Sequence, residues 1–174
     1  LGGAMVAGVR DGLGEAVARK RVGFAGDEPY FNSGVLVVNA AAWREAGYIE
    51  RLHQLGAAHG AAFKAADQDL INALCRRRAL ALDARWNIGQ HDFIFNGWDE
   101  FDPDTIVGIF HFSTMLKPWM AWSPEPPRRL YQRYARLSPL RMPEIAEPTT
   151  AAHRVSVELL ERAARRRGRT PEIA

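Results

Sequence analysis

The stretch Tyr30-Phe31-Asn32-Ser33-Gly34-Val35-Leu36-Val37-Val38-Asn39 places a continuous apolar run directly after an Asn-Ser-Gly turn. Four consecutive apolar residues, three of them β-branched, are typical of a strand buried on both faces, as in parallel sheets. We therefore expect a buried parallel-type strand over Val35–Val38. Asn32 carries an amide that donates and accepts hydrogen bonds, which suits sugar hydroxyls. A plain turn into a core strand, with Gly34 as a β-bulge, explains the same residues.

Apolar runs and helical patterns alternate on both sides of this strand. Further strands are expected over Ala4–Val9, Leu80–Trp86 and Ile106–Phe112. Helices are expected over Ala40–Gly60, Asp67–Arg78 and Arg128–Leu137, while Gly12–Gly26 fits a short helix or a loop. The aromatic-rich segment Gln90–Asp104 is expected to be a loop. Strands that alternate with helices favour an α/β fold with a mixed, largely parallel sheet.

The segment Asp67-Gln68-Asp69 opens one of these expected helices. An aspartate at this position commonly caps free backbone amides and complements the helix dipole. That explanation accounts for one aspartate but leaves two acids around a glutamine unexplained. The alternative is an amide and a carboxylate at a cleft, where both can hydrogen-bond a sugar ring. The residues alone leave both interpretations open.

The segment His111-Phe112-Ser113-Thr114-Met115-Leu116-Lys117-Pro118-Trp119 follows the last expected strand. A neutral imidazole is a ligand for divalent transition metals, and a lysine ammonium is a point charge for phosphate. Lys117 precedes a proline, which restricts its backbone to extended conformations. In α/β sheets ligands bind beyond the carboxyl ends of strands, so His111 and Lys117 suggest a metal–diphosphate site. A strand-end histidine and a solvated turn lysine are the simpler alternative.

In their order along the chain, these three motifs and Asp83-Ala84-Arg85-Trp86-Asn87 resemble glycosyltransferase family 8. This is a family of retaining galactosyl- and glucosyltransferases that includes lipooligosaccharide galactosyltransferases and glycogenin. The resemblance covers roughly Leu1–Trp119. It implies a GT-A fold, UDP-galactose or UDP-glucose as donor, a divalent metal that is usually manganese, and a glycan or glycolipid hydroxyl as acceptor. Lipopolysaccharide biosynthesis in a bacterium is the expected setting.

The resemblance also implies roles for individual residues. The catalytic residues would be Gln68 and Asp67, the metal ligand His111, and the substrate-binding residues Asn32, Ser33, Asp69, Lys117 and Trp119. The family's amide at the Gln68 position lies near the anomeric carbon of the donor. Since an amide is a poor nucleophile, a front-face mechanism fits better, with the leaving diphosphate accepting the acceptor's proton.

The chain departs from the family pattern in two places. Asp-x-Asp occurs only at Asp67–Asp69 and Asp102–Asp104, whereas the family's metal motif would precede Leu1. We therefore expect the C-terminal portion of such a transferase, which would be a piece of a longer protein. Thr114 stands where many members have glycine, and its branched side chain would crowd the phosphates.

The net charge of +3 comes from the tail, because residues 151–174 hold six arginines and three glutamates. The rest of the chain is balanced, so no nucleic-acid partner is expected. We expect a transferase portion over residues 1–138 and, over 139–174, a proline-bearing linker and basic tail. That tail would be either solvated or peripherally attached to an anionic membrane.

Cys75 is the only cysteine, which fits a reducing compartment and a structural thiol. Without a visible signal peptide or membrane-spanning run, the expected location is the cytoplasm, either free or peripheral on the inner face of the membrane.

Two other functions fit the same residues. A non-catalytic carbohydrate-binding module would keep the sugar-binding residues without a metal, and a truncated remnant would be inactive. Some aromatic residues are candidates for stacking against an acceptor, although packing explains them equally well: Phe93, Phe95, Trp98 and Trp119.

Overall fold

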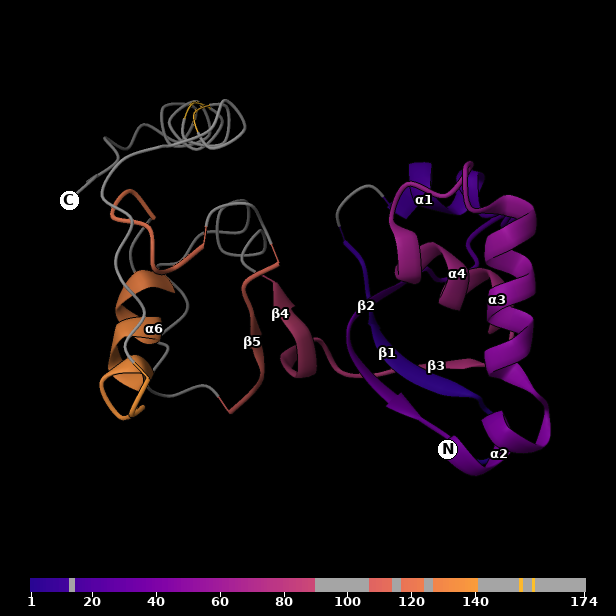
Figure 1. The fold of residues 1–174 in the computed structure, drawn as a ribbon, viewed down its shortest axis with the longest axis horizontal. Coiled ribbons are helices and arrows are strands. Elements are labelled where there is room, and N and C mark those ends of the chain that lie inside the picture. The colour runs from indigo at the N-terminus through magenta and orange to yellow at the C-terminus, as the bar shows by residue number, and fades with distance from the viewer. Residues whose placement is uncertain are drawn as a thin grey trace. The chain divides into compact units, whose positions relative to one another are not determined.

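The structure, a computed structural model, describes residues 1–12, 15–89, 107–113, 117–123, 127–140, 154 and 158. The chain divides into two compact units, Leu1–Ile88 and Gly89–Ala174, and each is described by itself (Figure 1). Some sequence-based expectations fall outside the described residues. These are the loop over Gln90–Asp104 with the stacking candidates Phe93, Phe95 and Trp98 and its Asp102-x-Asp104 motif, the crowding by Thr114, and nearly all of the basic tail.

The first unit is an α/β arrangement built on a three-stranded sheet. Its strands are β1 (Val6–Arg10), β2 (Phe31–Val38) and β3 (Ala79–Ala81), in the order β2-β1-β3. Strand β1 pairs antiparallel with β2 and parallel with β3, so the sheet is mixed, as expected. Its helices are α1 (Glu15–Arg21), α2 (Ala40–Glu45), α3 (Tyr48–His59), α4 (Ala66–Leu74) and the 3-10 helix η1 (Ala84–Asn87).

The expectation of a buried parallel strand at Val35–Val38 is wrong. Strand β2 begins at Phe31, so Asn32 and Ser33 lie inside the strand rather than before it, and its pairing with β1 is antiparallel. The side chains of Val37 and Val38 are 49% and 40% exposed. A β-branched run reports strand propensity well, but it does not report the direction of the neighbouring strand. The irregularity in this ladder lies between Gly8 and Arg10 of β1, not at Gly34.

Two expected helices differ from their apolar patterns: one is divided in two, and the other ends early. The pattern over Ala40–Gly60 is divided between α2 and α3, because Gly47 has a φ of 61° in the left-handed region. Helix α4 ends at Leu74, and Arg77 has a φ of 59°. Arg76 and Arg77 follow this helix end, and both bind the carboxylate of Glu28, at 2.6 and 3.2 Å. The expected strand Leu80–Trp86 is mostly replaced by η1.

The core of the first unit lies between the sheet and its helices. Met5, Val6, Tyr48 and Cys75 form its buried cluster, and the indole Nε1 of Trp43 donates to the carbonyl oxygen of Met5 at 2.9 Å. Cys75 is 1% exposed, and burial raises the pKa of its thiol to about 11. The thiol is therefore a packing group, as the sequence predicts.

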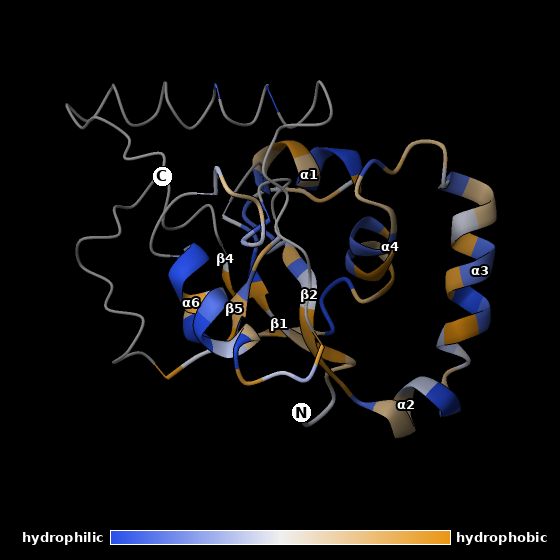
Figure 2. Cartoon of the chain, turned by 60° about the vertical axis from the view of Figure 1, so that its left-hand side comes forward, coloured by the Kyte–Doolittle hydropathy of each residue, from blue (hydrophilic) through white to orange (hydrophobic). Residues whose placement is uncertain are grey.

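The second unit contains short elements. Strand β5 (Phe110–His111) pairs with β4 (Ile88–Gly89), which lies at the boundary between the units. Of the strand expected over Ile106–Phe112, the structure therefore retains two residues. Helix α6 (Pro127–Ala135) confirms the predicted helix, and Figure 2 shows its mostly hydrophilic surface. In the described parts of the chain, no helix is long and apolar enough to cross a membrane.

Candidate functional site

The polar residues of the first unit gather at one edge of its sheet. Asp11 follows the carboxyl end of β1, and η1 follows that of β3, which runs parallel to β1. Strand β2 runs in the opposite direction, and its first residue Phe31 pairs with Arg10. The start of β2 therefore lies beside the end of β1. Ligands bind at this edge in α/β sheets, so the topology agrees with the predicted position of a site.

Gln68 is held in this edge by contacts at both ends of its amide. Its Oε1 accepts a hydrogen bond from the backbone N–H of Ser33 at 3.0 Å. Its Nε2 donates to the carboxylate of Asp11 at 2.7 Å. Two predicted site residues, Gln68 and Ser33, are therefore brought into direct contact. Asp11 is a member of the cluster that the sequence analysis did not identify as a candidate.

Asn32 is oriented in a similar way. Its Oδ1 accepts from the backbone N–H of Gly34 at 2.9 Å and from the Nδ2 of Asn87 at 2.8 Å. Because its oxygen is engaged by two donors, the remaining hydrogen-bonding capacity of Asn32 is chiefly that of its NH₂ group. Asn87, at the end of η1, therefore joins the polar cluster from the segment that follows β3.

Asp67 presents a different environment from its neighbours. It lies in the first turn of α4 and is exposed. Among the described residues no group donates a hydrogen bond to its carboxylate. The backbone before it is unusual, because Ala66 has a φ of 36°, a conformation that costs energy for residues with a Cβ. Asp67 therefore offers an acceptor to solvent or to a ligand at the same helix start that holds Gln68.

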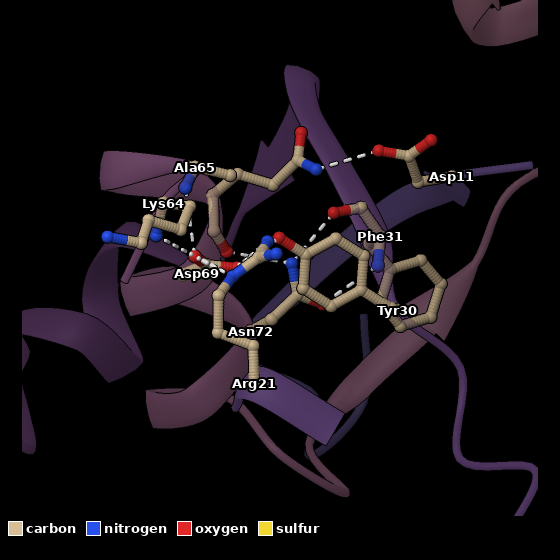
Figure 3. A network of polar contacts seen from close by, with 9 residues as sticks. Asp11, Arg21, Tyr30, Phe31, Lys64, Ala65, Asp69 and Asn72 are labelled. Atoms are coloured by element: carbon tan, nitrogen blue, oxygen red, sulfur yellow. Dashed lines mark hydrogen bonds and ion pairs between the residues drawn. The ribbon is translucent and has the colours of Figure 1, made fainter. Parts of the chain in front are cut away.

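The substrate contact expected for Asp69 does not agree with its geometry (Figure 3). Its carboxylate is 0% exposed and accepts five hydrogen bonds from the protein. Arg21 binds it through two nitrogens at 2.7 and 2.8 Å, and the Tyr30 hydroxyl donates at 2.6 Å. The backbone N–H groups of Lys64 and Ala65 complete the set at 2.8 and 2.9 Å. Because all five donors belong to the protein, Asp69 stabilises the turn before α4.

The protonation of this buried cluster follows from its contacts. Burial alone would raise the pKa of Asp69, but hydrogen bonds from Arg21, Tyr30 and the Ala65 backbone lower it to about 2. Burial and the bond to Asp69 raise the pKa of the Tyr30 hydroxyl above its usual value. The carboxylate is therefore ionised and the phenol neutral over the whole physiological range.

Asn72 ties the same helix to the same strand. It lies one turn after Gln68 on α4 and is buried. Its Oδ1 accepts from the backbone N–H of Phe31 at 2.8 Å, and its Nδ2 donates to the carbonyl of Phe31 at 2.7 Å. Gln68 makes the corresponding contact with Ser33, two residues further along β2. The amides at positions i and i+4 of the helix thus bind the backbone of residues j+2 and j of the strand, respectively.

The second unit holds the other predicted site residues. The Nζ of Lys117 donates to the carbonyl oxygen of Phe112 at 2.6 Å. The ring of Trp119 lies 5.7 Å from that of Tyr131 on α6, so it takes part in packing. His111 is partly buried at the end of β5. Any role of these groups toward a diphosphate or a metal remains a prediction.

A complete metal site is not assembled within the described ranges. There, no three His, Cys, Asp or Glu side chains come together as a ligand set. His111 would supply one imidazole, and the remaining ligands would have to come from residues elsewhere. The described residues therefore do not by themselves fit a bound divalent ion.

Comparison with known proteins decides the family. The sequence matches the profile of glycosyl transferase family 8 over residues 1–123. The chain belongs to glycosyl transferase family 8. It is 29% identical over 116 residues to the glycosyltransferase GlyF of Streptococcus pneumoniae, covering 64% of this chain and 28% of GlyF. It is 26% identical over 142 residues to the lipopolysaccharide 1,2-glucosyltransferase of Escherichia coli, covering 76% and 41% of the two chains.

Solved structures of glycosyltransferases share the fold. The galactosyltransferase LgtC, solved with donor and acceptor sugar analogs, superposes with a TM-score of 0.65 at 21% identity, covering 79% of this chain and 54% of LgtC. The apo form of GlyE from Streptococcus pneumoniae gives a TM-score of 0.57 at 22% identity, covering 76% and 33%. These likenesses support the GT-A fold. The family 8 chain described here spans about half or less of the length of these relatives.

The family 8 motifs identified candidate residues at the start of β2 and at the start of α4. They did not identify the residues that hold these two segments in place. The sequence analysis assigned no role to Asp11, Arg21, Tyr30 or Asn72. Asp11 carried a usable signal, since it is an acid directly after a buried strand that ends on the ligand-binding edge. Arg21 and Asn72 carried none, because their partners lie 48 and 41 residues away in the sequence.

Proposed function

We propose that this chain is part of a retaining hexosyltransferase. The enzyme would move galactose or glucose from UDP-galactose or UDP-glucose to a hydroxyl of a glycan or glycolipid. Membership of family 8 and the likeness to a lipopolysaccharide glucosyltransferase and to LgtC support this proposal. The observation that carries it is the set of Asn32, Asp67 and Gln68 at the ligand-binding edge of the sheet, where two amides are oriented and one carboxylate is exposed.

The chemistry of these groups suits a donor sugar. A carboxylate accepts hydrogen bonds only, so Asp67 would bind two sugar hydroxyls as donors, while the NH₂ group of Asn32 would donate to a hydroxyl or ring oxygen. Gln68 would lie against the anomeric carbon, where its amide dipole stabilises the positive charge that develops on the sugar. Hydroxyl recognition by fixed polar groups gives strong discrimination against analogues that lack the hydroxyl.

The reaction that fits an amide at this position is a front-face displacement. The bond from the anomeric carbon to the diphosphate oxygen breaks, and the acceptor oxygen bonds to the anomeric carbon on the same face. The acceptor's proton passes to the diphosphate oxygen that leaves, so the configuration is retained and no side chain needs to become a nucleophile. The poor nucleophilicity of a carboxamide favours this course over a covalent intermediate on Gln68.

Three residues of the second unit are proposed to bind the donor or its metal. We propose that Lys117 binds the diphosphate, exchanging its contact with the Phe112 carbonyl for a phosphate oxygen. His111 is proposed as one ligand of a divalent metal, with manganese as the expected ion. Trp119, packed against Tyr131, is proposed as a further substrate-binding residue. Peripheral attachment to membrane through residues 139–174 remains part of the proposal.

Turnover of the donor tests this function. UDP release from UDP-galactose and UDP-glucose would be measured with manganese present, on the longer transferase that contains this chain, as wild type, Gln68→Ala and the control Gln54→Ala. Gln54 is an exposed amide on α3, outside the site. We expect Gln68→Ala to reduce the rate about a hundredfold, as for loss of one stabilising dipole at a reaction centre, and Gln54→Ala to leave it unchanged. No release from either donor, or equal rates for Gln68→Ala and wild type, would contradict the proposal.

A further inference from the structure

We propose that Asp11 is a positioning residue that sets the orientation of the Gln68 amide. This inference rests on the proposed function, because it concerns the same sugar site, and it adds a residue that the motifs do not identify. The structural basis is the pair of contacts on the two ends of one carboxamide: the backbone N–H of Ser33 on Oε1, and the carboxylate of Asp11 on Nε2. Asp11 acts through Gln68 and need not touch the substrate.

The two contacts make one orientation of the amide strongly preferred. A backbone N–H can only donate, and an ionised carboxylate can only accept. If the amide turned by 180°, its oxygen would face the Asp11 carboxylate at about the 2.7 Å of the present contact, and its NH₂ group would face the N–H of Ser33. Both hydrogen bonds would be replaced by contacts between like groups. The assignment of oxygen and nitrogen is therefore dictated by partners whose own polarity is fixed.

This preference matters for recognition because the amide presents different chemistry in its two orientations. The exposed side of a carboxamide shows an oxygen lone pair in one place and an N–H in another, and a sugar hydroxyl distinguishes the two. Without the Asp11 contact, only the single bond from Ser33 would oppose the flipped form. Asp11 is thus expected to reduce the heterogeneity of the group that faces the anomeric centre, a form of preorganisation.

Asp11 is itself held in place by the backbone of Tyr30. It directly follows β1, and its backbone N–H donates to the carbonyl of Tyr30 at 2.9 Å. Tyr30 in turn holds the buried carboxylate of Asp69 on α4, the helix that carries Gln68. The acceptor and the amide that it binds are therefore attached to the same rigid network, which fixes their separation.

Binding experiments separate positioning from direct contact. Binding of UDP-galactose and UDP-glucose, each compared with UDP alone, would be measured for Asp11→Asn, Asp11→Ala and the exposed-acid control Asp27→Ala. The contribution of the hexose to affinity should fall about tenfold in Asp11→Ala, as for loss of one hydrogen bond to a charged group. Asp11→Asn keeps an oxygen acceptor and should stay within about threefold of wild type. Asp27→Ala should bind as wild type does.

A double-mutant cycle with Gln68→Ala supplies the decisive comparison. If Asp11 acts through Gln68, then adding Asp11→Ala to Gln68→Ala changes hexose binding by less than about twofold, because the group to be oriented is already gone. The inference is overturned if Asp11→Ala binds both donors as wild type does. It is also overturned if Asp11→Asn loses as much as Asp11→Ala, or if the loss persists in the Gln68→Ala background.

A readout without ligand keeps this inference distinct from the proposed function. In ¹H–¹⁵N spectra of the free chain, Asp11→Ala should move the Nε2 resonances of Gln68, while Asp27→Ala leaves them in place. If wild type binds UDP-hexoses no better than UDP, the proposed function fails, yet the spectra still report the contact. Unmoved Gln68 resonances in Asp11→Ala would overturn the inference whatever the donor does.

Discussion

Single side chains at the site divide into those that bind the protein and one that faces solvent. Asp69 is saturated by five protein donors, and Gln68 and Asn32 are oriented by their neighbours, whereas Asp67 is exposed. This division accounts for two aspartates around one glutamine. The first aspartate is free to accept from a ligand, and the second stabilises the turn that carries it.

Asp67 should matter for activity and not for stability. Asp67→Asn removes an exposed carboxylate with no protein donor among the described residues, so the free energy of unfolding should change by less than about 0.5 kcal/mol. Turnover of UDP-hexose should fall sharply, because an amide binds only one of two donor hydroxyls in the same way. Urea unfolding and UDP release, measured on the same preparation, check the two halves. A destabilised variant with normal turnover would reverse the assignment.

Asp69 should show the opposite behaviour. Asp69→Asn removes the buried anion that the partly buried guanidinium of Arg21 binds, which is expected to cost about 3 kcal/mol of folding stability. The exposed-acid variant Asp27→Asn is the matched control and should unfold as wild type does. Equal urea midpoints for Asp69→Asn and wild type would show that the buried pair contributes nothing.

The same carboxylate predicts a pH dependence. Its pKa is about 2 when folded and about 3.9 when unfolded, so the unfolded chain binds the proton first as the pH falls. Stabilisation of about 2–3 kcal/mol is therefore complete above about pH 4 and is lost as the pH falls toward about 2. Urea unfolding at several acidic pH values should show this slope in wild type and a reduced slope in Asp69→Asn. Parallel slopes for the two proteins would contradict the assigned pKa.

The largest differences between the sequence-based expectations and the structure concern the secondary-structure elements. Apolar periodicity correctly predicted α3, α4 and α6, because each buries one face of a helix. It could not show that Gly47 divides α2 from α3, since one residue of positive φ leaves the apolar period nearly intact. Nor could it show that Asn72 binds the backbone of Phe31, because that contact joins residues 41 positions apart.

The break at Gly47 predicts a clear difference between two glycines. Gly47→Ala should destabilise the chain by about 1 kcal/mol, because its φ of 61° disfavours any Cβ, while nothing within 4 Å opposes the added carbon. Gly56→Ala, inside α3, is the control and should stabilise by about 0.5–1 kcal/mol, with its Cβ in ordinary contact at 3.8 Å from Leu70. Thermal unfolding of both variants measures the difference. Equal shifts would argue against a helix break at Gly47.

At the scale of the whole molecule, the motifs predicted the family and the fold class. Four short motifs in one order identified family 8, and the profile match over residues 1–123 agrees. The sequence could not provide the sheet directions or the partners of buried polar groups, because these depend on long-range packing. Among the described residues no three His, Cys, Asp or Glu side chains come together, so the metal role of His111 stays a prediction.

The basic tail makes a prediction at the same scale. If residues 139–174 attach the protein to membrane, the full chain should sediment with vesicles containing anionic lipid and less with neutral ones, because arginines are attracted to the surface potential. A chain ending at Pro139 should lose this binding, and high salt should weaken it. Equal sedimentation of the two chains would exclude the tail as the anchor.

The central claim is that the donor hexose binds at Asn32, Asp67 and Gln68. Its most direct test is to measure contact between the hexose and the protein. Saturation-transfer NMR on UDP-galactose and UDP-glucose, with diamagnetic Mg²⁺ in place of paramagnetic Mn²⁺, reports which donor protons touch the protein. We predict saturation of the hexose protons by the wild-type chain, its loss in Asp67→Asn and its retention in Asp27→Asn. Absence of hexose saturation in wild type, or equal saturation in Asp67→Asn, would contradict a donor-sugar site at Asn32, Asp67 and Gln68.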